Sequence, residues 1–159
     1  MTTIVKFNDW TFEVDRILTE QTYKKFSGSG AEICGCNNCK NYIAYRNEVF
    51  PEEVINLFND LGIDYRKEVE IFSYETFSNG LHHMSGWFHF KGQILTGKDY
   101  RVPLTSGGHT FELTQITDKF LIGFAAESDL TFFEDDTGLV QLQFDTHIPW
   151  VIDKSLESS

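Results

Sequence analysis

Short apolar runs separated by turn residues fill the second half of the chain. In "SGWFHFKGQIL", the positions follow the two-residue period of a strand, so that Trp87 and His89 share one face and the phenylalanines beside them share the other. Asn-Gly, Gly-Gly and Thr-Asp pairs, which are typical of turns, separate several of these runs. The pattern predicts six strands, over residues 67–77, 85–95, 109–117, 119–127, 130–135 and 138–150. "EDDTG" predicts a tight hairpin between the last two.

The N-terminal segment "DWTFEVDRIL" predicts another half-buried strand. Trp10, Phe12 and Val14 alternate with polar residues, which is the period of a strand with one buried face. The next segment, "TEQTYKKFSGSG", is interpreted as a turn, a short second strand and a flexible polar loop. A helix from Asp15 to Phe26, capped by Asp15, is the alternative. We prefer the hairpin.

Two short helices are predicted near the N-terminal third of the chain. "NNCKNYIAYRN" indicates a helix with Asn37 or Asn38 as its N-cap. "FPEEVINLFNDLGI" is the clearer helix, because Pro51 suits a first turn and Gly62 stands where a C-terminal cap is expected. The apolar residues of this second helix fall on one stripe, so we expect it to bury one face.

Strands that follow one another without intervening helices predict an antiparallel sheet. The expected fold class is therefore α+β, with a mostly antiparallel β-sheet and two short helices. A chain of 159 residues fits one domain, and the sequence contains no internal repeat or linker. We predict a single globular domain over residues 1–153 and a frayed C-terminal tail over residues 154–159.

The charge is strongly acidic, with 24 acidic against 13 basic residues and a net charge of −11. Such a field repels phosphate backbones and anionic lipids, so nucleic acid and membrane surfaces are poor partners. A basic protein or a cation is the easier partner electrostatically. We therefore expect a protein or small-molecule partner. The sequence gives neither the identity of this partner nor the oligomeric state.

Features of a secreted or membrane-inserted chain are lacking in the sequence. The segment "MTTIVKFNDWTFEVDR" has no apolar run of signal-peptide length, and no uninterrupted apolar stretch of about 18 residues occurs elsewhere. Three closely spaced cysteines cannot all pair within one chain, which fits a reducing compartment better than a disulfide framework. We predict a cytoplasmic location.

All three cysteines lie within "CGCNNCKNY", residues 34 to 42. Cys36 and Cys39 have the C-x2-C spacing of zinc sites, and Cys34 could point to the same side if the chain approaches the helix in an extended form. Gly35 would let the backbone bend around an ion. A structural zinc site takes four tetrahedral ligands, so three thiolates need one more.

The segment "GLHHMSGWFHF" is the best source of a fourth ligand among the five histidines of the chain. His89 lies within its predicted strand, and His82 and His83 precede that strand with opposite expected directions. The candidate metal ligands are therefore Cys34, Cys36, Cys39, His82, His83 and His89.

Two other interpretations of the cysteines stay open. Free cysteine is among the most buried residue types and packs as a small hydrophobe; we prefer this packing role, so zinc is not favoured. A cysteine in the first turn of a helix lies beside unpaired backbone N–H groups, which lower its pKa and give a reactive thiol. Cys36 and Cys39 also have the spacing of redox motifs, although the parallel-sheet context of thioredoxin-like proteins is absent.

Four segments occur in the order "CGCNNCKNY", "FPEEVINLFNDLGID", "GLHHMSGWFHFKGQI" and "LVQLQFDTHIPWVID". Together they resemble a family of small bacterial cytosolic proteins of unknown function, with a C-G-C-x-x-C-x-N motif, an L-G-I-D helix end, a G-W-F-H-F-x-G strand and a closing P-W-V strand. The resemblance spans roughly residues 34 to 153. The matching positions are Cys34, Gly35, Cys36, Cys39, Asn41, 61–64, 86–90, Gly92 and 149–151. It implies a shared fold and a role for these positions, and it assigns no reaction.

Two functions from different classes follow. The preferred one is a non-enzymatic binding or interaction domain, with an acidic, aromatic-rich sheet as its recognition surface and no catalytic residue. The alternative is a metal- or thiol-dependent enzyme that uses Cys34, Cys36 and Cys39 with a histidine from residues 82–89. No G-x-x-x-x-G-K-[ST], G-x-S-x-G, H-E-x-x-H or G-x-G-x-x-G motif supports a more specific enzyme class.

Overall fold

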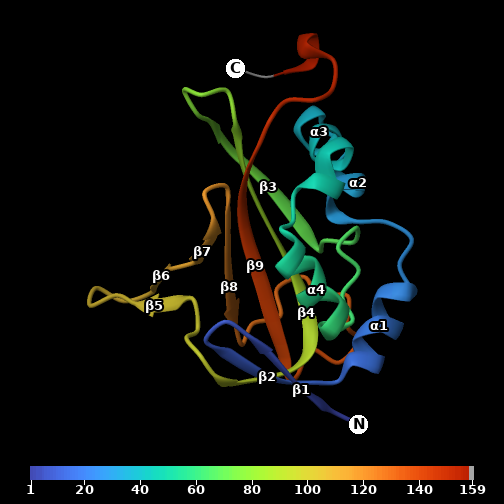
Figure 1. Cartoon of the computed structure of the whole chain (residues 1–159), viewed down its shortest axis with the longest axis vertical. Helices are drawn as coiled ribbons and strands as arrows, with labels where there is room; N and C mark the ends of the chain where they lie inside the picture. The colour runs from blue at the N-terminus through green and yellow to red at the C-terminus, as the bar shows by residue number, and fades with distance from the viewer. Residues whose placement is uncertain (158–159) are drawn as a thin grey trace.

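The longest strand, β4 (His82–Thr96), runs through the middle of a seven-stranded antiparallel sheet in the computed structural model, which describes residues 1–157 (Figure 1). The order across the sheet is β1-β2-β4-β9-β8-β7, and β3 pairs with β4 beside β2. The other strands are β1 (Thr3–Phe7), β2 (Trp10–Val14), β3 (Glu70–Thr76), β7 (Thr114–Thr117), β8 (Phe120–Ala125) and β9 (Leu139–Ile148), with β5 (Arg101–Pro103) and β6 (His109–Phe111) as a separate two-stranded sheet. The helices are α1 (Arg16–Lys24), α2 (Gly30–Cys34), α3 (Asn37–Tyr45) and α4 (Glu52–Leu61), with short 3-10 turns η1 (Arg46–Glu48) and η2 (Lys154–Leu156).

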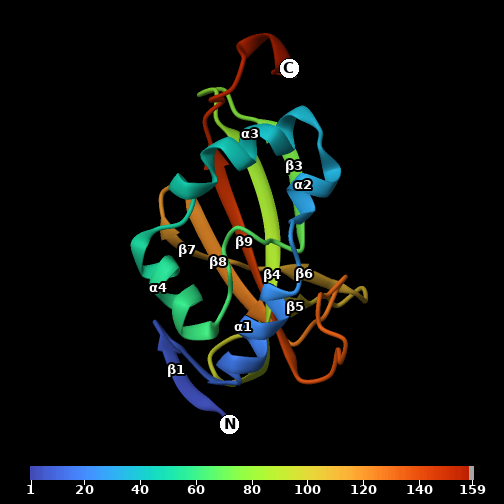
Figure 2. The same cartoon turned by 90° about the vertical axis from the view of Figure 1, so that its right-hand side faces the viewer.

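The pairing of β4 with β9 divides the sheet into two faces. It runs without interruption from His82 opposite Ile148 to Lys91 opposite Leu139. Since neighbouring side chains of a strand point to opposite sides, the even-numbered residues of both strands share one face. The four helices cover that face, here called the inner face, and the β5–β6 hairpin projects on the opposite side, the outer face (Figures 1 and 2).

Phenylalanine rings fill the space between the inner face and α4. Phe50, just before α4, lies 5.1 Å from the ring centre of Phe58, 6.0 Å from that of Phe88 and 5.1 Å from that of Phe144. Burial of large apolar side chains is the main stabilising contribution in such a core. The α4 helix ends at Gly62 in a left-handed conformation, which confirms the predicted helix and its cap.

The edge of β4 opposite β9 has two strand partners with a gap between them. β3 pairs with residues 82–87 of β4, and β2 pairs with residues 92–96. In the gap, the Tyr23 hydroxyl of α1 donates to the carbonyl of His89 (3.0 Å) and accepts from its N–H (2.9 Å). The Thr19 hydroxyl, one helical turn earlier, accepts from the N–H of Lys91 (3.0 Å). The four residues from Thr19 to Tyr23 rise about 6 Å along the helix, and two strand residues span about 6.6 Å, so α1 can replace a missing strand at this place.

The predicted hairpin over residues 15–26 is wrong, and the helical alternative is correct, because the chain forms α1 there. Asp15 caps α1 by accepting from the N–H of Leu18 (3.0 Å). The helix buries Thr19, Thr22 and Tyr23. Its inward face therefore carries hydroxyl groups that bond to backbone, and a pattern based on apolar residues does not register such a face.

The predicted strand over residues 130–135 and its hairpin are also wrong. These residues belong to the loop between β8 and β9, and Phe132 stacks on Phe26 (4.4 Å between ring centres). The segment 109–117 is divided into β6 and β7.

The α+β class with a mostly antiparallel sheet is confirmed, with four short α-helices in place of the two expected. None of the helices within residues 1–157 is long and apolar enough to span a bilayer.

The tail expected over residues 154–159 is described up to Glu157, and residues 158–159 lie outside the described part. The chain forms η2 there, and a carboxylate oxygen of Glu157 lies 2.6 Å from Nε2 of His82.

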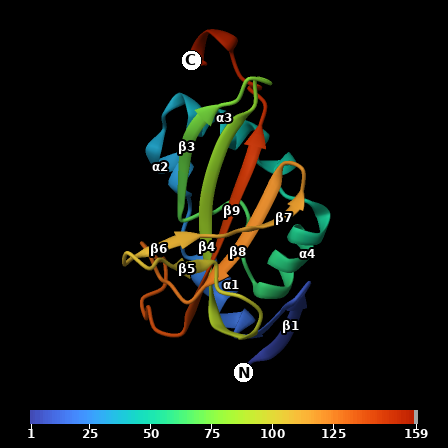
Figure 3. The same cartoon turned by 90° about the vertical axis from the view of Figure 1, so that its left-hand side faces the viewer.

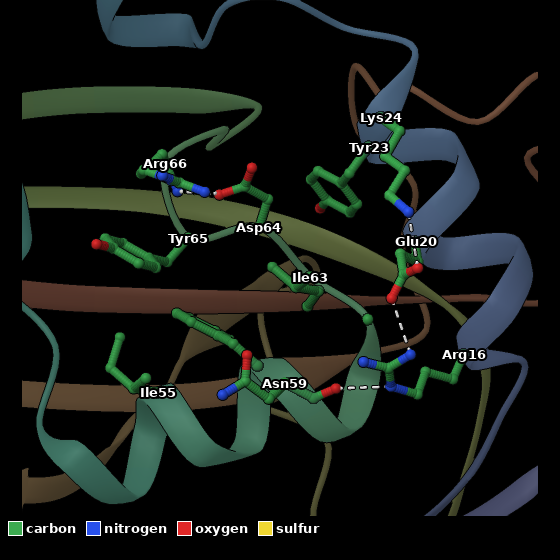
Figure 4. A pocket seen from close by; sticks show the side chains of 12 residues that line it. Arg16, Glu20, Tyr23, Lys24, Ile55, Asn59, Ile63, Asp64, Tyr65 and Arg66 are labelled. Carbon is green, nitrogen blue, oxygen red and sulfur yellow. Dashed lines mark hydrogen bonds and ion pairs between the residues drawn. The ribbon is translucent and has the colours of Figure 1, made fainter.

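A junction between α1 and α4 holds α1 in place, beside a cavity of about 340 Å³ (Figure 4). Arg16 Nε donates to the carbonyl of Asn59 near the end of α4 (2.8 Å), while Glu20 pairs with both Arg16 and Lys24. Gly62 has φ +85°, and a Cβ on it would lie 2.5 Å from the carbonyl oxygen of Arg16. The close approach of the two helices therefore depends on glycine at this position.

Removing the Tyr23 hydroxyl should destabilise the protein. Tyr23→Phe leaves the buried N–H and carbonyl of His89 without their partner, which costs about 1–3 kcal/mol of unfolding free energy. Tyr42→Phe is the matched control, because Tyr42 is equally buried and its hydroxyl has no hydrogen-bond partner. Urea denaturation should give a stability for Tyr42→Phe equal to or above that of the wild type. Equal losses in the two variants would show that the Tyr23 bonds contribute nothing specific.

Gly62→Ala should destabilise the protein more than Gly80→Ala. Gly80 has nearly the same φ, +86°, but no heavy atom lies within 4 Å of a Cβ added there. Gly80→Ala therefore carries only the left-handed backbone penalty, about 1–2 kcal/mol. Gly62→Ala adds a contact with backbone, worth about 1–3 kcal/mol more. Thermal unfolding of the two variants measures the difference, and equal melting temperatures would contradict the close helix contact.

Candidate metal centre

The helix α2 begins with Ser29 as its N-cap. Ser29 Oγ accepts from the N–H of Glu32 (3.3 Å), and the Ser29 hydroxyl also donates to the Glu32 carboxylate (3.3 Å). A Cβ on Gly30 would lie 2.6 Å from the carbonyl oxygen of Val69, so α2 packs directly on the segment that leads into β3. These contacts fix the helix whose last residue is Cys34.

Gly35 then reverses the chain between α2 and α3. Its φ of +67° is left-handed, and its N–H donates to the carbonyl of Ala31 (3.1 Å). The next residue, Cys36, is the N-cap of α3, and its Sγ accepts from the N–H of Cys39 (3.4 Å). The expected cap was Asn37 or Asn38, so the thiol takes the position that an asparagine or serine oxygen usually holds.

The three thiols converge as a result of this turn. The Sγ atoms of Cys34, Cys36 and Cys39 all lie within 4.8 Å of one another. Cys34 and Cys36 are exposed, whereas Cys39 is buried and belongs to the core. Thiolates around a metal at a bond length of about 2.3 Å are about 3.8–4.0 Å apart, so a contraction of about 1 Å or less would bring them to bonding distance.

The environments of Cys36 and Cys39 differ in their effect on ionisation. Partial burial opposes ionisation of Cys36, but hydrogen bonds from the N–H groups of Cys39 and Asn38 and from the neighbouring thiols outweigh it and lower its pKa. Burial raises the pKa of Cys39 strongly, and bonds to the other two thiols add to the increase. A thiolate therefore forms first at the exposed end of the cluster.

A buried ion pair between Glu68 and Arg46 contacts the N-terminal end of α2, the helix that carries Cys34. Glu68 is fully buried; its carboxylate accepts from the N–H of Ala31 (3.1 Å) and lies 3.4 Å from Nη1 of Arg46. Arg46 also donates to Ser29 Oγ (3.3 Å). Burial raises the pKa of Glu68, and the bonds from Ser29, Ala31 and Arg46 oppose that increase. Composition and periodicity did not single out this pair, because its partners are far apart in sequence.

Asn41 connects α3 to the end of β9. Its Nδ2 donates to the carbonyl of Pro149 (3.0 Å), and its Oδ1 accepts from the N–H of Val151 (2.7 Å). The side chain is 1% exposed, so both bonds are shielded from water. Two of the four family-like segments, C-G-C-x-x-C-x-N and P-W-V, are thereby in direct contact.

His82 is engaged by groups other than the thiols. Its Nδ1 lies 3.2 Å from the Thr76 hydroxyl, and its Nε2 lies 2.6 Å from Glu157. The ring also lies against Trp150, with 5.2 Å between ring centres. Both ring nitrogens therefore have partners at the far end of β4.

His83 and His89 lie on the outer face of the sheet, away from the helices that carry the cysteines. His83 Nε2 is 3.4 Å from the carboxylate of Asp145. His89 is fully buried, its Nε2 donates to Oε1 of Gln141 (2.9 Å), and its Nδ1 has no partner. Burial lowers the pKa of His89 to about 4, so the ring is neutral at pH 7. Within residues 1–157, the ligand cluster thus contains the three cysteines and none of the three candidate histidines.

Comparison with protein-family models, with curated proteins and with solved structures finds no match for this chain. The family resemblance of the four segments stays a prediction. Function must therefore be inferred from the side chains that the fold brings together, and within residues 1–157 the three thiols are the one group of three or more potential metal ligands.

Proposed function

We propose that this protein is a non-enzymatic binding domain, and that Cys34, Cys36 and Cys39 hold a thiophilic d10 metal ion, Zn²⁺ or Cu⁺. The observation that carries the proposal is the convergence of the three Sγ atoms within 4.8 Å. Soft thiolates select these ions over Mg²⁺ and Ca²⁺, which prefer oxygen. A reducing compartment such as the cytoplasm would keep the thiols free for metal.

A three-thiolate site removes the need for a distant fourth ligand. Cu⁺ accepts three sulfur ligands, and Zn²⁺ with three protein ligands takes a water or another molecule in the fourth position. Because Cys34 and Cys36 are exposed, that position would face solvent. The preference for a packing role over zinc rests on the usual burial of free cysteine. Only Cys39 is buried, whereas Cys34 and Cys36 are exposed, which favours metal binding by the cluster.

The surroundings of the thiols favour binding over catalysis. A general base must lie within hydrogen-bond reach of the group it deprotonates. His82 bonds to Thr76 and Glu157, and His89 bonds to Gln141. No histidine in residues 1–157 belongs to the thiol cluster. A metal- or thiol-dependent enzyme that uses one of these histidines is therefore the less supported alternative.

Thiol–disulfide exchange is a second candidate, which the pairing of an exposed Cys36 with a buried Cys39 favours. The Cys36 thiolate would attack a partner's disulfide, and Cys39 would resolve the mixed disulfide. The partner would be reduced to two thiols and a Cys36–Cys39 disulfide would form. This reaction gives no role to Cys34, whereas metal binding uses all three sulfurs, so we prefer metal binding.

Metal titration should reveal one ion per chain. The reduced, tag-free protein is titrated with Zn²⁺ against a chromophoric chelator and, under anaerobic conditions, with Cu⁺ against a bidentate copper(I) indicator. Cys36→Ser should weaken binding at least about 100-fold, because even residues that only orient a ligand can change metal affinity 10–100-fold. His83→Gln, which changes a candidate ligand on the outer face, should leave the affinity within about twofold, since a residue must contact the metal or one of its ligands to cause such a loss.

Three results would contradict metal binding. They are a stoichiometry near zero for both ions, an unchanged affinity in Cys36→Ser, and a large loss in His83→Gln. If neither ion binds and mild oxidation gives a Cys36–Cys39 disulfide that a dithiol reverses, the exchange reaction becomes the better proposal.

A further inference from the structure

The outer face carries a groove beside the connection between β6 and β7. Figure 3 shows β6 and β7 crossing in front of the lower part of the sheet, with the outer face of β3, β4 and β9 uncovered above them. The groove has a volume of about 480 Å³, within the range of ligand sites. Its lining includes Tyr74, His83, Phe111, Glu112, Gln143 and Asp145.

Aromatic rings form a continuous row from the groove along the outer face. Trp87 lies 5.5 Å from Phe72, Phe72 lies 6.5 Å from Tyr74, and Tyr74 lies 4.7 Å from His83, measured between ring centres. Phe72 is 43% exposed and Tyr74 59% exposed, and Phe111 on the opposite wall is 56% exposed. A cluster of large rings left half open to water marks a binding surface.

The charge of the groove restricts what can bind there. Its lining residues, all within residues 1–157, include two carboxylates, Glu112 and Asp145, and no lysine or arginine. Asp145 pairs with His83 (3.4 Å) and lies near His147, and Glu112 pairs with Lys98 (3.1 Å) at the surface. Exposed ion pairs contribute little, so a ligand cation can displace Lys98. The net charge of −11 adds an attractive field for any cation.

We propose that this groove binds an arginine-bearing segment of a partner protein. A guanidinium group is planar, stacks on aromatic faces and donates paired hydrogen bonds to a carboxylate. Tyr74 and Phe111 provide the faces, and Asp145 and Glu112 provide the carboxylates. The open row toward Trp87 leaves room for neighbouring residues of an extended peptide. The groove is independent of the thiol cluster, which lies on the helical side of the sheet.

Arginine fits the groove better than the other candidate ligands. An ammonium group of lysine is a point charge that is strongly hydrated and cannot stack, so it gains less from the rings. Phosphate-bearing ligands are repelled by the two carboxylates and by the net charge. A purely apolar segment would leave Asp145 and Glu112 next to it without a compensating charge.

Fluorescence anisotropy with labelled peptides tests the proposal. The probe is fluorescein-labelled Gly-Arg-Gly-Arg-Gly, with Gly-Lys-Gly-Lys-Gly as a probe of equal charge, in about 150 mM salt, where the Debye length is about 8 Å. We expect the arginine peptide to bind at least about threefold more tightly than the lysine peptide. Tyr74→Ala and Asp145→Asn should each weaken its binding about fivefold, the loss expected for one cation–π contact or one charge-assisted bond.

Asp60→Asn is the matched control, because it removes the same charge from an exposed position of α4, on the helical side of the sheet. It should change the affinity less than about twofold at this salt concentration. Three results would overturn the proposal: no binding up to about 1 mM, which corresponds to about −4 kcal/mol; equal affinity for the two peptides; and equal losses in Asp60→Asn and Asp145→Asn. The last result would mean that only the long-range field attracts the peptide.

Discussion

The uninterrupted pairing of β4 with β9 determines where the side chains of these two central strands point. Because His82 faces Ile148 and Lys91 faces Leu139, the even-numbered residues of β4 and β9 build the core under the helices and their odd-numbered residues lie on the outer face. His83 and His89 therefore lie on the side of the sheet away from α2 and α3. The same register places Asp145 beside His83, where it forms one wall of the outer groove.

The opposite edge of β4 explains why a helix stands where a second hairpin was expected. β2 and β3 both pair with β4 but leave His89 and Lys91 between them without a strand partner on this edge. The hydroxyls of Tyr23 and Thr19 satisfy backbone groups of these residues, which accounts for the polar residues on the buried face of α1. Apolar periodicity predicts α4, whose buried face is hydrophobic, and it fails for α1, whose buried face is held by hydrogen bonds.

In the candidate site, too, contacts between residues close in sequence were easier to predict than contacts between residues far apart. The short C-G-C-x-x-C spacing indicated that the thiols could meet, but the extended approach expected for Cys34 is wrong. Cys34 is the last residue of α2, and the left-handed turn at Gly35 brings it to the other two thiols. The partners of the histidines could not, since Glu157, Asp145 and Gln141 reach them only through strand pairing and the path of the C-terminal segment. The Arg46–Glu68 pair and the bonds of Asn41 are likewise products of tertiary packing.

Within residues 1–157 the thiol cluster contains no histidine, so the proposed site would hold a metal with three sulfur ligands and one open position. X-ray absorption at the zinc edge of the zinc-loaded protein measures that ligand set directly. We expect three sulfur atoms at about 2.3 Å and one oxygen at about 2.1 Å, without the outer-shell scattering of an imidazole ring. A histidine in the coordination shell, or fewer than three sulfurs, would contradict this account.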